Sequence, residues 1–340
     1  LHDGRRLMGG EPTPVDPATL VYRPLDQARE LGAVVRLFDL AGWGPVTEAD
    51  VRSWVADDPE GPWLVMGAVH EPGGEVLGIA MYSPHRVQFL DRVGRAGRAR
   101  SVVLDPRVRR AERGVVTVDE GDPLRRMIVA SRPERTRHGW ELVFSLPNPK
   151  MVRRSELRTY PDDTSGSRVT LGNGLRLDLR HGATANGRVA PADDPPGPEY
   201  DDLWPAAREG LGIECAVVRD ASSVARRPGL RLELRAPGTG HLLGYTVFSD
   251  DAGGKLEDLL AVDAAALEEL LVGSLGWLRA NPGAHDLEFA NSTPHPVYGE
   301  HLRAVGATEI DWLFAFSVTA FPPREAPELD ASRWDVTVGD

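Results

Sequence analysis

The sequence predicts an α/β protein in which one arrangement, a mixed and largely antiparallel sheet flanked by helices, occurs twice. The length of 340 residues favours two domains over one. Each half contains hairpin-like strands followed by a helix and a further strand, and then a turn with Asn and Pro at residues 146–149 or 290–294. A duplicated fold is the simplest explanation of this repetition.

In the first half, a strand near Tyr22 is followed by two helices, the second with Thr47 and Asp50 as a capping box. Pro72, Gly73 and Gly74 predict the turn of a hairpin, and Pro133 is expected to limit the later helix. The predicted elements in order are a strand from residue 22, helices over 31–38 and from 47, strands over 63–70, 75–82 and 100–104, a helix over 124–130 and a strand over 141–146.

The middle of the chain differs in composition. Strand-like residues 169–171 and 175–179 flank Gly172-Asn173-Gly174, which predicts a hairpin. Residues 181–200 are rich in Gly, Ala, Asp and Pro, and are predicted to form a linker.

In the second half, Asp263 can cap a helix whose apolar face includes Leu267, Leu270 and Leu271. The other predicted elements are strands over 230–234, 241–248, 255–260, 287–290 and 312–318 and a helix over 293–306. The predicted domain boundaries are a flexible N-terminal segment 1–18, a first domain 19–165, a hairpin and linker 166–200, a second domain 201–322 and a C-terminal tail 323–340.

Composition excludes several classes of protein. An apolar fraction of 41% with eight Trp is enough for real cores, and no apolar run approaches the roughly 20 residues that span a bilayer. The single Cys215 excludes an intrachain disulfide and a Cys-based zinc site, and its apolar neighbours predict a buried, inert thiol. No metal site is predicted, and residues 1–10 do not resemble a secretory signal. We expect a soluble, cytoplasmic protein.

Charge is distributed unevenly. The chain carries a formal net charge of -12, yet residues 86–137 hold 14 Arg against seven acidic residues. Clustered guanidinium groups suit phosphate or carboxylate ligands. The acidic remainder of the chain argues against nucleic-acid binding, because duplex affinity needs a broad basic surface.

The sequence Val102-Val103-Leu104-Asp105-Pro106, followed by an Arg-rich turn and a helix, resembles the GNAT superfamily of acyl-CoA-dependent acyltransferases. Residues 142–148 and 244–260 are similar to strands of its tandem-domain members. The resemblance covers residues 22–160 and 201–318, and implies two tandem GNAT-like domains, acetyl-CoA or another acyl-CoA as cofactor, and acyl transfer to a small amine or hydroxyl acceptor.

Members of this superfamily bind the CoA pyrophosphate with a pattern like Pro-x-x-Arg-Gly-x-Gly-x-Gly. Pro106 and Arg109 match, Gly114 matches the last glycine, and Arg110 and Glu112 replace the other two. The second half runs from strand to helix over residues 260–266 without such a loop. The cofactor-binding residues that the resemblance implies are Val103, Leu104, Arg109, Arg110, Arg113 and Gly114.

Two interpretations stay open. In the first, Arg side chains including Arg107 replace the missing glycines as phosphate ligands, or receive the phosphopantetheine of an acidic acyl carrier protein. In the second, Arg110 and Glu112 mark a GNAT-derived scaffold without CoA chemistry, which acts as a small-molecule binding protein or as an enzyme with a different reaction.

Acyl transfer needs a base for the acceptor proton and an acid for the leaving thiolate. The resemblance implies Tyr298 as the acid, with a packed helix aromatic as the alternative. Glu257 and Asp258 are candidate bases on opposite faces of a strand, with a solvated strand edge as the alternative. Tyr82 and His85, expected after the hairpin strand, are candidates for an acceptor pocket, with plain surface residues as the alternative. The sequence predicts no oligomeric state.

Overall fold

The structure is a computed structural model that describes residues 13–56, 58–108, 122–146, 167–177, 187–227, 229–249, 256–281, 287–289, 296–320 and 333–335. It divides into two compact units. The first comprises Leu1–Pro84 and Gly97–Gly139, and the second His85–Ala96 and Trp140–Asp340. Strands β3 (Glu75–Phe89) and β4 (Arg92–Leu104) contribute residues to both units.

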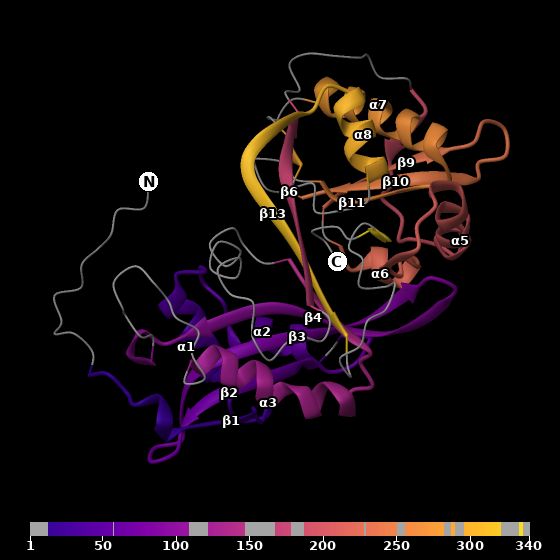
Figure 1. The fold of residues 1–340 in the computed structure, drawn as a ribbon. Helices are drawn as coiled ribbons and strands as arrows, with labels where there is room; N and C mark the ends of the chain where they lie inside the picture. Colours follow the sequence, from indigo (N-terminus) through magenta and orange to yellow (C-terminus); the bar gives the residue numbers. More distant parts are fainter. Residues whose placement is uncertain are drawn as a thin grey trace. The chain divides into compact units, whose positions relative to one another are not determined.

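The first unit is a sheet with the strand order β1-β2-β3-β4 and helices on both faces (Figure 1). Helices α1 and α2 share a core with one face of β2, β3 and β4, whereas α3 packs against β1 and β2. The remaining elements are η1 (Pro17–Thr19), β1 (Leu20–Pro24), α1 (Leu31–Ala41), α2 (Glu48–Ala56), β2 (Leu64–His70), η2 (Pro106–Val108) and α3 (Pro123–Arg137).

Local sequence explains the helix ends of this unit. The Thr47 amide donates to Asp50 Oδ2 at 2.8 Å, and the Asp50 amide donates to Thr47 Oγ1 at 3.2 Å, which confirms the predicted capping box. Gly42 ends α1 with a φ of 71°, a left-handed conformation that glycine adopts without a Cβ penalty.

The second unit contains a four-stranded sheet of order β11-β10-β9-β7. Helix α7 packs against all four strands, and α5 packs against β10 and β11. The Ala266 amide donates to Asp263 Oδ1 at 2.8 Å, so the predicted cap of α7 is confirmed, and the predicted apolar face of α7 is buried. The elements are β7 (Val189–Pro191), α5 (Glu199–Leu211), β9 (Leu230–Arg235), β10 (Leu242–Phe248), β11 (Leu256–Ala261) and α7 (Ala264–Ala280).

A second set of strands in this unit has the order β5-β13-β6-β12, with antiparallel neighbours. Figure 1 shows β13 alongside β6. The long strand β13 therefore lies between two strands that precede it by more than a hundred residues. Strand β8 pairs with the end of β3 and, in parallel, with β14. The elements are β5 (Leu142–Ser145), β6 (Ser167–Leu177), β8 (Cys215–Val217), α6 (Ala221–Ala225), β12 (Leu287–Phe289), α8 (Pro296–Ala304), β13 (Thr308–Ala320) and β14 (Trp334–Asp335).

The mixed α/β class is confirmed, and the series β2-β3-β4-α3-β5 recurs as β9-β10-β11-α7-β12. The two compact units group strands by where they pack, whereas the predicted domain boundaries follow the repeat in the sequence. The units therefore do not test these boundaries, which stay a prediction. Among the described residues, no helix is long and apolar enough to cross a bilayer.

The predicted hairpin at Gly172-Asn173-Gly174 is wrong. These residues lie inside the continuous strand β6, where Asn173 pairs with Leu313 and Gly174 with Ile310. Two residues of β13 bulge out opposite this point. The local pattern was misleading because the pairing partner of β6 comes from near the end of the chain.

Other element predictions are also corrected. The segment predicted as a linker contains β7, which pairs with β9, and the first residues of α5. Helix α3 continues past Pro133 to Arg137. Pro133 has no amide hydrogen to donate to the carbonyl of Val129, four residues earlier in the helix. Val129 is exposed, so water can bond to this carbonyl instead.

Candidate functional site

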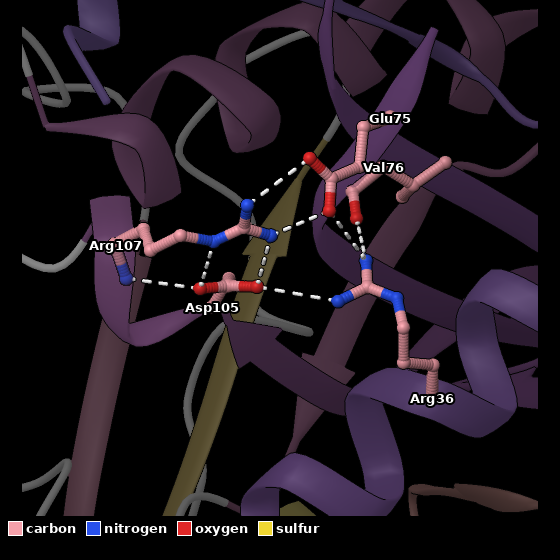
Figure 2. Close-up of polar contacts among 5 residues, drawn as sticks. All are labelled: Arg36, Glu75, Val76, Asp105 and Arg107. Carbon is pink, nitrogen blue, oxygen red and sulfur yellow. Dashed lines mark hydrogen bonds and ion pairs between the residues drawn. The ribbon is translucent and has the colours of Figure 1, made fainter. Parts of the chain in front are cut away.

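The carboxyl end of β4, where the resemblance implies a phosphate-binding loop, is held by an ion network (Figure 2). Arg107 donates from Nε to Asp105 Oδ1 at 3.0 Å and from Nη2 to Asp105 Oδ2 at 2.8 Å. Its Nη1 also donates to Glu75 Oε2 at 3.1 Å. Arg36 of α1 donates to Asp105 Oδ2 at 3.2 Å and to the carbonyl of Val76. We call Arg36, Glu75, Asp105 and Arg107 the β4-end network.

Asp105 is the centre of the β4-end network, and its side chain is 4% exposed. Burial raises the pKa of this carboxyl, but hydrogen bonds from the side chain and amide of Arg107 outweigh burial and lower the pKa to about 2. The pKa of Arg107 rises, because Asp105 and Glu75 stabilise its charge. Arg107 is thus committed to two carboxylates of the chain, and is not placed as a phosphate ligand.

Helix α3 follows β4, and helix α7 follows β11, the corresponding strand of the second repeat. A carboxylate of the chain itself caps the start of each helix. Asp122 Oδ1 accepts from the Leu124 amide at 2.8 Å, and Asp263 caps α7 in the same way. Pro123 removes a further amide at the start of α3. A phosphate at a helix N-terminus binds to these same free amides, so at each of these helix starts one of the amides is already engaged by the chain.

The residues implied for cofactor binding have different outcomes. Val103 is buried in the core beneath α1 and α2, and Leu104 is half-buried near Gly78. Their side chains therefore pack within the first unit. Arg109, Arg110, Arg113 and Gly114 lie outside the described residues.

Tyr82 and His85 lie within strand β3 and not in a loop after it, so their expected position is corrected. Tyr82 is buried in the first unit, and its hydroxyl accepts from Arg135 Nη2 at 2.6 Å. His85 is 9% exposed in the second unit, with its ring centroid 5.7 Å from that of Phe144. Alternation along β3 predicts that these two side chains point to opposite faces of the strand.

Asp258 and Tyr298, both predicted from the second half, meet in one buried network. Arg219 Nε lies 3.0 Å from Asp258 Oδ1, and Arg219 Nη1 lies 2.5 Å from Asp335 Oδ2. The Tyr298 hydroxyl donates to Asp335 Oδ2 at 3.2 Å. Arg227 forms an ion pair with Asp258, and the Tyr245 hydroxyl donates to Asp258 Oδ2 at 2.6 Å. We call Arg219, Arg227, Tyr245, Asp258, Tyr298 and Asp335 the buried network.

Both oxygens of Asp258 are held by other groups of the chain. Oδ1 accepts from the Leu259 amide at 2.9 Å and faces Arg219, while Oδ2 accepts from Tyr245 and faces Arg227. One hydrogen bond and one guanidinium group at each oxygen fix this carboxylate in the network, which favours a structural role over that of a base. Glu257 is half-buried and follows the opposite orientation along β11.

The two tyrosines of this network hold their protons tightly. Burial, followed by the charge of Asp335, raises the pKa of Tyr298 well above its usual range. Burial and the charge of Asp258 act in the same direction on the pKa of Tyr245. Each phenol donates a hydrogen bond to a carboxylate of the network. This arrangement is typical of a structural hydrogen bond.

Sequence reasoning missed Arg219, Arg227 and Asp335. Arg219 follows an apolar strand, and Asp335 belongs to the part predicted as a tail. Only the fold brings these segments together, so no local pattern could have found them. Cys215 is fully buried. Within the described ranges, no group of three or more His, Cys, Asp or Glu side chains could hold a metal ion.

No family model matches the chain, and no curated protein matches it. Solved structures do. A GCN5-related N-acetyltransferase from Kribbella flavida is 17% identical, with a TM-score of 0.55 over 90% of this chain and 72% of that one. A tandem GNAT protein from the clavulanic acid biosynthesis pathway is 17% identical, with a TM-score of 0.52 over 90% of this chain and 100% of that one.

The N-myristoyltransferase of Saccharomyces cerevisiae, solved with bound myristoyl-CoA, is 10% identical and has a TM-score of 0.56 over 94% of this chain and 82% of that one. At these identities the likeness concerns the fold. It extends over both repeats, in agreement with the recurring series of elements.

Proposed function

Because the chain has the tandem GNAT fold, we propose that it is an acyltransferase that moves an acyl group from a thioester to a small amine or hydroxyl acceptor. The thioester donor is acetyl-CoA, a longer acyl-CoA or an acyl carrier protein. The observation that carries this proposal is the match over 90% of the chain to a tandem GNAT protein. Because one fold can host many activities, acyl transfer by this chain is tested directly by release of free thiol from a thioester donor.

We assign the chemistry to the first repeat. In the second repeat, the strand β11 runs into α7 without a phosphate-binding loop, Asp263 caps the helix, and Asp258 is held by hydrogen bonds and ion pairs. Among the described residues, the start of α7 is therefore poorly suited to bind phosphate, and Asp258 is poorly suited to act as a base. The second repeat then serves as a scaffold.

In the first repeat, the phosphate of the donor would be held by the side chains of Arg109, Arg110 and Arg113, since Asp122 engages the Leu124 amide at the start of α3 and Pro123 has no amide hydrogen. A bound thioester supplies an activated carbonyl. His85 is the residue that we propose as proton acceptor, because a neutral imidazole can take the acceptor proton near pH 7. Tyr82 faces the other side of β3 and receives no part in this step.

The test measures release of free thiol from acetyl-CoA, octanoyl-CoA and acetylated acyl carrier protein with a panel of amines and alcohols. We expect turnover with at least one donor, and a fall in kcat of about 100-fold or more for His85→Gln. Tyr298→Phe is the matched variant in the second repeat and should keep kcat within about threefold. Absence of transfer from all donors, together with no binding of acetyl-CoA at millimolar concentration by calorimetry, would reject the proposal.

A second candidate is a GNAT-derived scaffold that binds a small molecule without CoA. It is supported by Arg110 and Glu112 at positions where the superfamily pattern has glycine. Glu112→Gly separates the two candidates, because improved CoA binding indicates a weakened thioester site, whereas unchanged absence of binding favours the scaffold. A cytoplasmic location and a role in small-molecule metabolism stay predictions.

A further inference from the structure

The first unit exposes two tryptophans, one just after α1 and one on α2. Trp43 is 53% exposed and Trp54 is 40% exposed, whereas the other tryptophans that the structure describes are half-buried or buried. Both indoles contact the same buried residue, Phe38, at ring-centroid distances of 5.1 and 6.3 Å. They therefore belong to one aromatic surface and are not two isolated exposed residues.

The backbone at the end of α1 holds Trp43 in place. The Gly42 amide donates to the carbonyl of Asp39 at 3.0 Å, and the Trp43 amide donates to the carbonyl of Phe38 at 3.2 Å. In this type of helix end, the residue after the glycine packs against the last helical turn. One part of the indole is thus fixed on Phe38, and the rest of the side chain faces water. A side chain that is already fixed loses little conformational entropy when a partner binds to it.

A carboxylate precedes each of these indoles by four residues. Asp39 and Asp50 are both exposed, and Asp50 lies one helical turn from Trp54 on α2, so these two side chains are neighbours. Hydrogen bonds from the hydroxyl and amide of Thr47 lower the pKa of Asp50, so this carboxyl stays charged. In the described part of the chain, Asp39 has no ion-pair partner. We call Asp39, Trp43, Asp50 and Trp54 the acidic aromatic patch.

The charge around the acidic aromatic patch is negative. Residues 39–60 hold six acidic residues and one basic residue, Arg52. Arg52 is two positions from both Asp50 and Trp54, about 200° around the helix, and so projects from the other side of α2. Nucleic acids and anionic membranes carry phosphate groups and attract basic surfaces, so they do not suit this patch. Its charge is complementary to a cationic partner.

The two kinds of side chain in the patch suit guanidinium groups in particular. An indole attracts a cation to its face more strongly than other aromatic rings do, and a guanidinium group both stacks on rings and pairs with carboxylates. The first unit already contains such a contact, because Arg100 lies over the ring of Trp63 at 5.7 Å from its centroid. A small cation needs a pocket that surrounds it, whereas exposed tryptophans are typical of the central contacts of protein interfaces.

We infer that the acidic aromatic patch binds an arginine-containing segment of a partner protein, with guanidinium groups stacked on Trp43 and Trp54 and paired with Asp39 and Asp50. This binding does not require acyl transfer. Its test is therefore separate from the test of the proposed function.

The experiment measures, by fluorescence anisotropy, the binding of a labelled peptide of three Arg-Gly repeats to the full chain, beside a Lys-Gly peptide of equal charge. We expect the lysine peptide to bind about tenfold more weakly, because an ammonium group is more strongly hydrated and does not stack. Trp43→Leu combined with Trp54→Leu keeps apolar contacts with Phe38, and should weaken binding of the arginine peptide by about tenfold. Equal binding of the two peptides, or unchanged binding to the double variant, would overturn the inference.

The contribution of charge is tested with two variants that each remove one exposed aspartate. Asp39→Asn should weaken binding of the arginine peptide by about threefold. Asp193→Asn, in the second unit, is the matched control and should leave binding unchanged. Both variants change the net charge by the same amount, so equal losses would mean general attraction to an acidic protein and would overturn the inference. Equal Tm values show that all the variants remain folded.

NMR spectra of protein with nitrogen-15-labelled tryptophan locate the bound peptide. The double variant identifies the indole signals of Trp43 and Trp54, and we expect the arginine peptide to shift these two signals and leave the others in place. Shifts confined to other tryptophans would overturn the inference. Sedimentation of the protein alone tests a different occupant. A dimer that the double variant abolishes would assign the patch to a second copy of the chain, and would also overturn the inference.

Discussion

The β4-end network and the buried network both join two arginines to two carboxylates, but they differ in exposure. In the β4-end network, the side chains of Arg36 and Glu75 are 38% and 43% exposed. In the buried network, the side chains of Arg219, Asp258 and Asp335 are all 0% exposed. Solvent can compensate a lost partner in the first case and cannot in the second. The same residue types therefore form a partly exposed ion network in one unit and a buried ion network in the other.

The largest expected effect comes from breaking the buried network. Asp258→Asn removes a buried negative charge that the guanidinium groups of Arg219 and Arg227 both face, while Asp335 continues to face Arg219. We expect the free energy of unfolding to fall by about 3–5 kcal/mol, measured by urea denaturation. Glu257→Gln is the control on the same strand, and should change the stability by less than about 1 kcal/mol. Similar losses in the two variants would contradict the comparison.

A smaller effect is expected at the β4-end network. Asp105→Asn should lower the free energy of unfolding by about 2 kcal/mol at pH 7, since the pKa of Asp105 falls from 3.8 to about 2 on folding. A carboxyl with a lowered pKa in the folded state stabilises above its unfolded pKa and loses this contribution on acidification. The difference between the variant and the wild type should therefore be constant above about pH 5 and shrink as the pH falls from 4 towards 2. A difference that stays the same at pH 2.5 would refute this account.

A smaller loss of stability is expected when a single hydrogen bond is removed from the buried network. Tyr298→Phe keeps the packed ring but deletes the donor to Asp335. The expected loss is about 1–2 kcal/mol in thermal or urea denaturation. Because Arg219 still faces Asp335, the loss should be smaller than for Asp258→Asn. An equal or larger loss would mean that the phenol, and not the guanidinium, holds the carboxylate.

The smallest effect is expected for an ion pair that both partners expose. Arg303 and Glu309 lie 2.9 Å apart with side chains about half exposed. Arg303→Gln should change the free energy of unfolding by less than about 1 kcal/mol, and high salt should remove the difference. If this change rivals that of Asp105→Asn, exposure does not control the strength of these pairs.

Features that depend on neighbouring residues were predictable from the sequence. The capping box of Thr47 and Asp50, the cap at Asp263 and the buried face of α7 follow from spacing within one or two turns. The recurring series of strands and helix was also predictable, because hairpins and their following helices are contiguous in the chain.

Features that depend on distant segments were not predictable. The pattern at Gly172-Asn173-Gly174 indicated a hairpin, but β13 pairs along the whole of β6. His85 lies inside β3, which extends to Phe89 and there pairs with β8 more than a hundred residues later in the chain. Asp258 and Tyr298 were named separately as a candidate base and a candidate acid, and the structure places both in one buried network. Their partners Arg219 and Asp335 come from segments without a distinguishing pattern.

The position of β13 between β5 and β6 has a consequence for biosynthesis. A ribosome makes β5 and β6 long before β13, so during synthesis these strands expose unpaired edges, which are templates for association with other chains. Pairing between strands that lie so far apart in the sequence is also slow. We therefore expect fragments that end before residue 308 to aggregate, and the nascent chain to need protection until its last strands emerge.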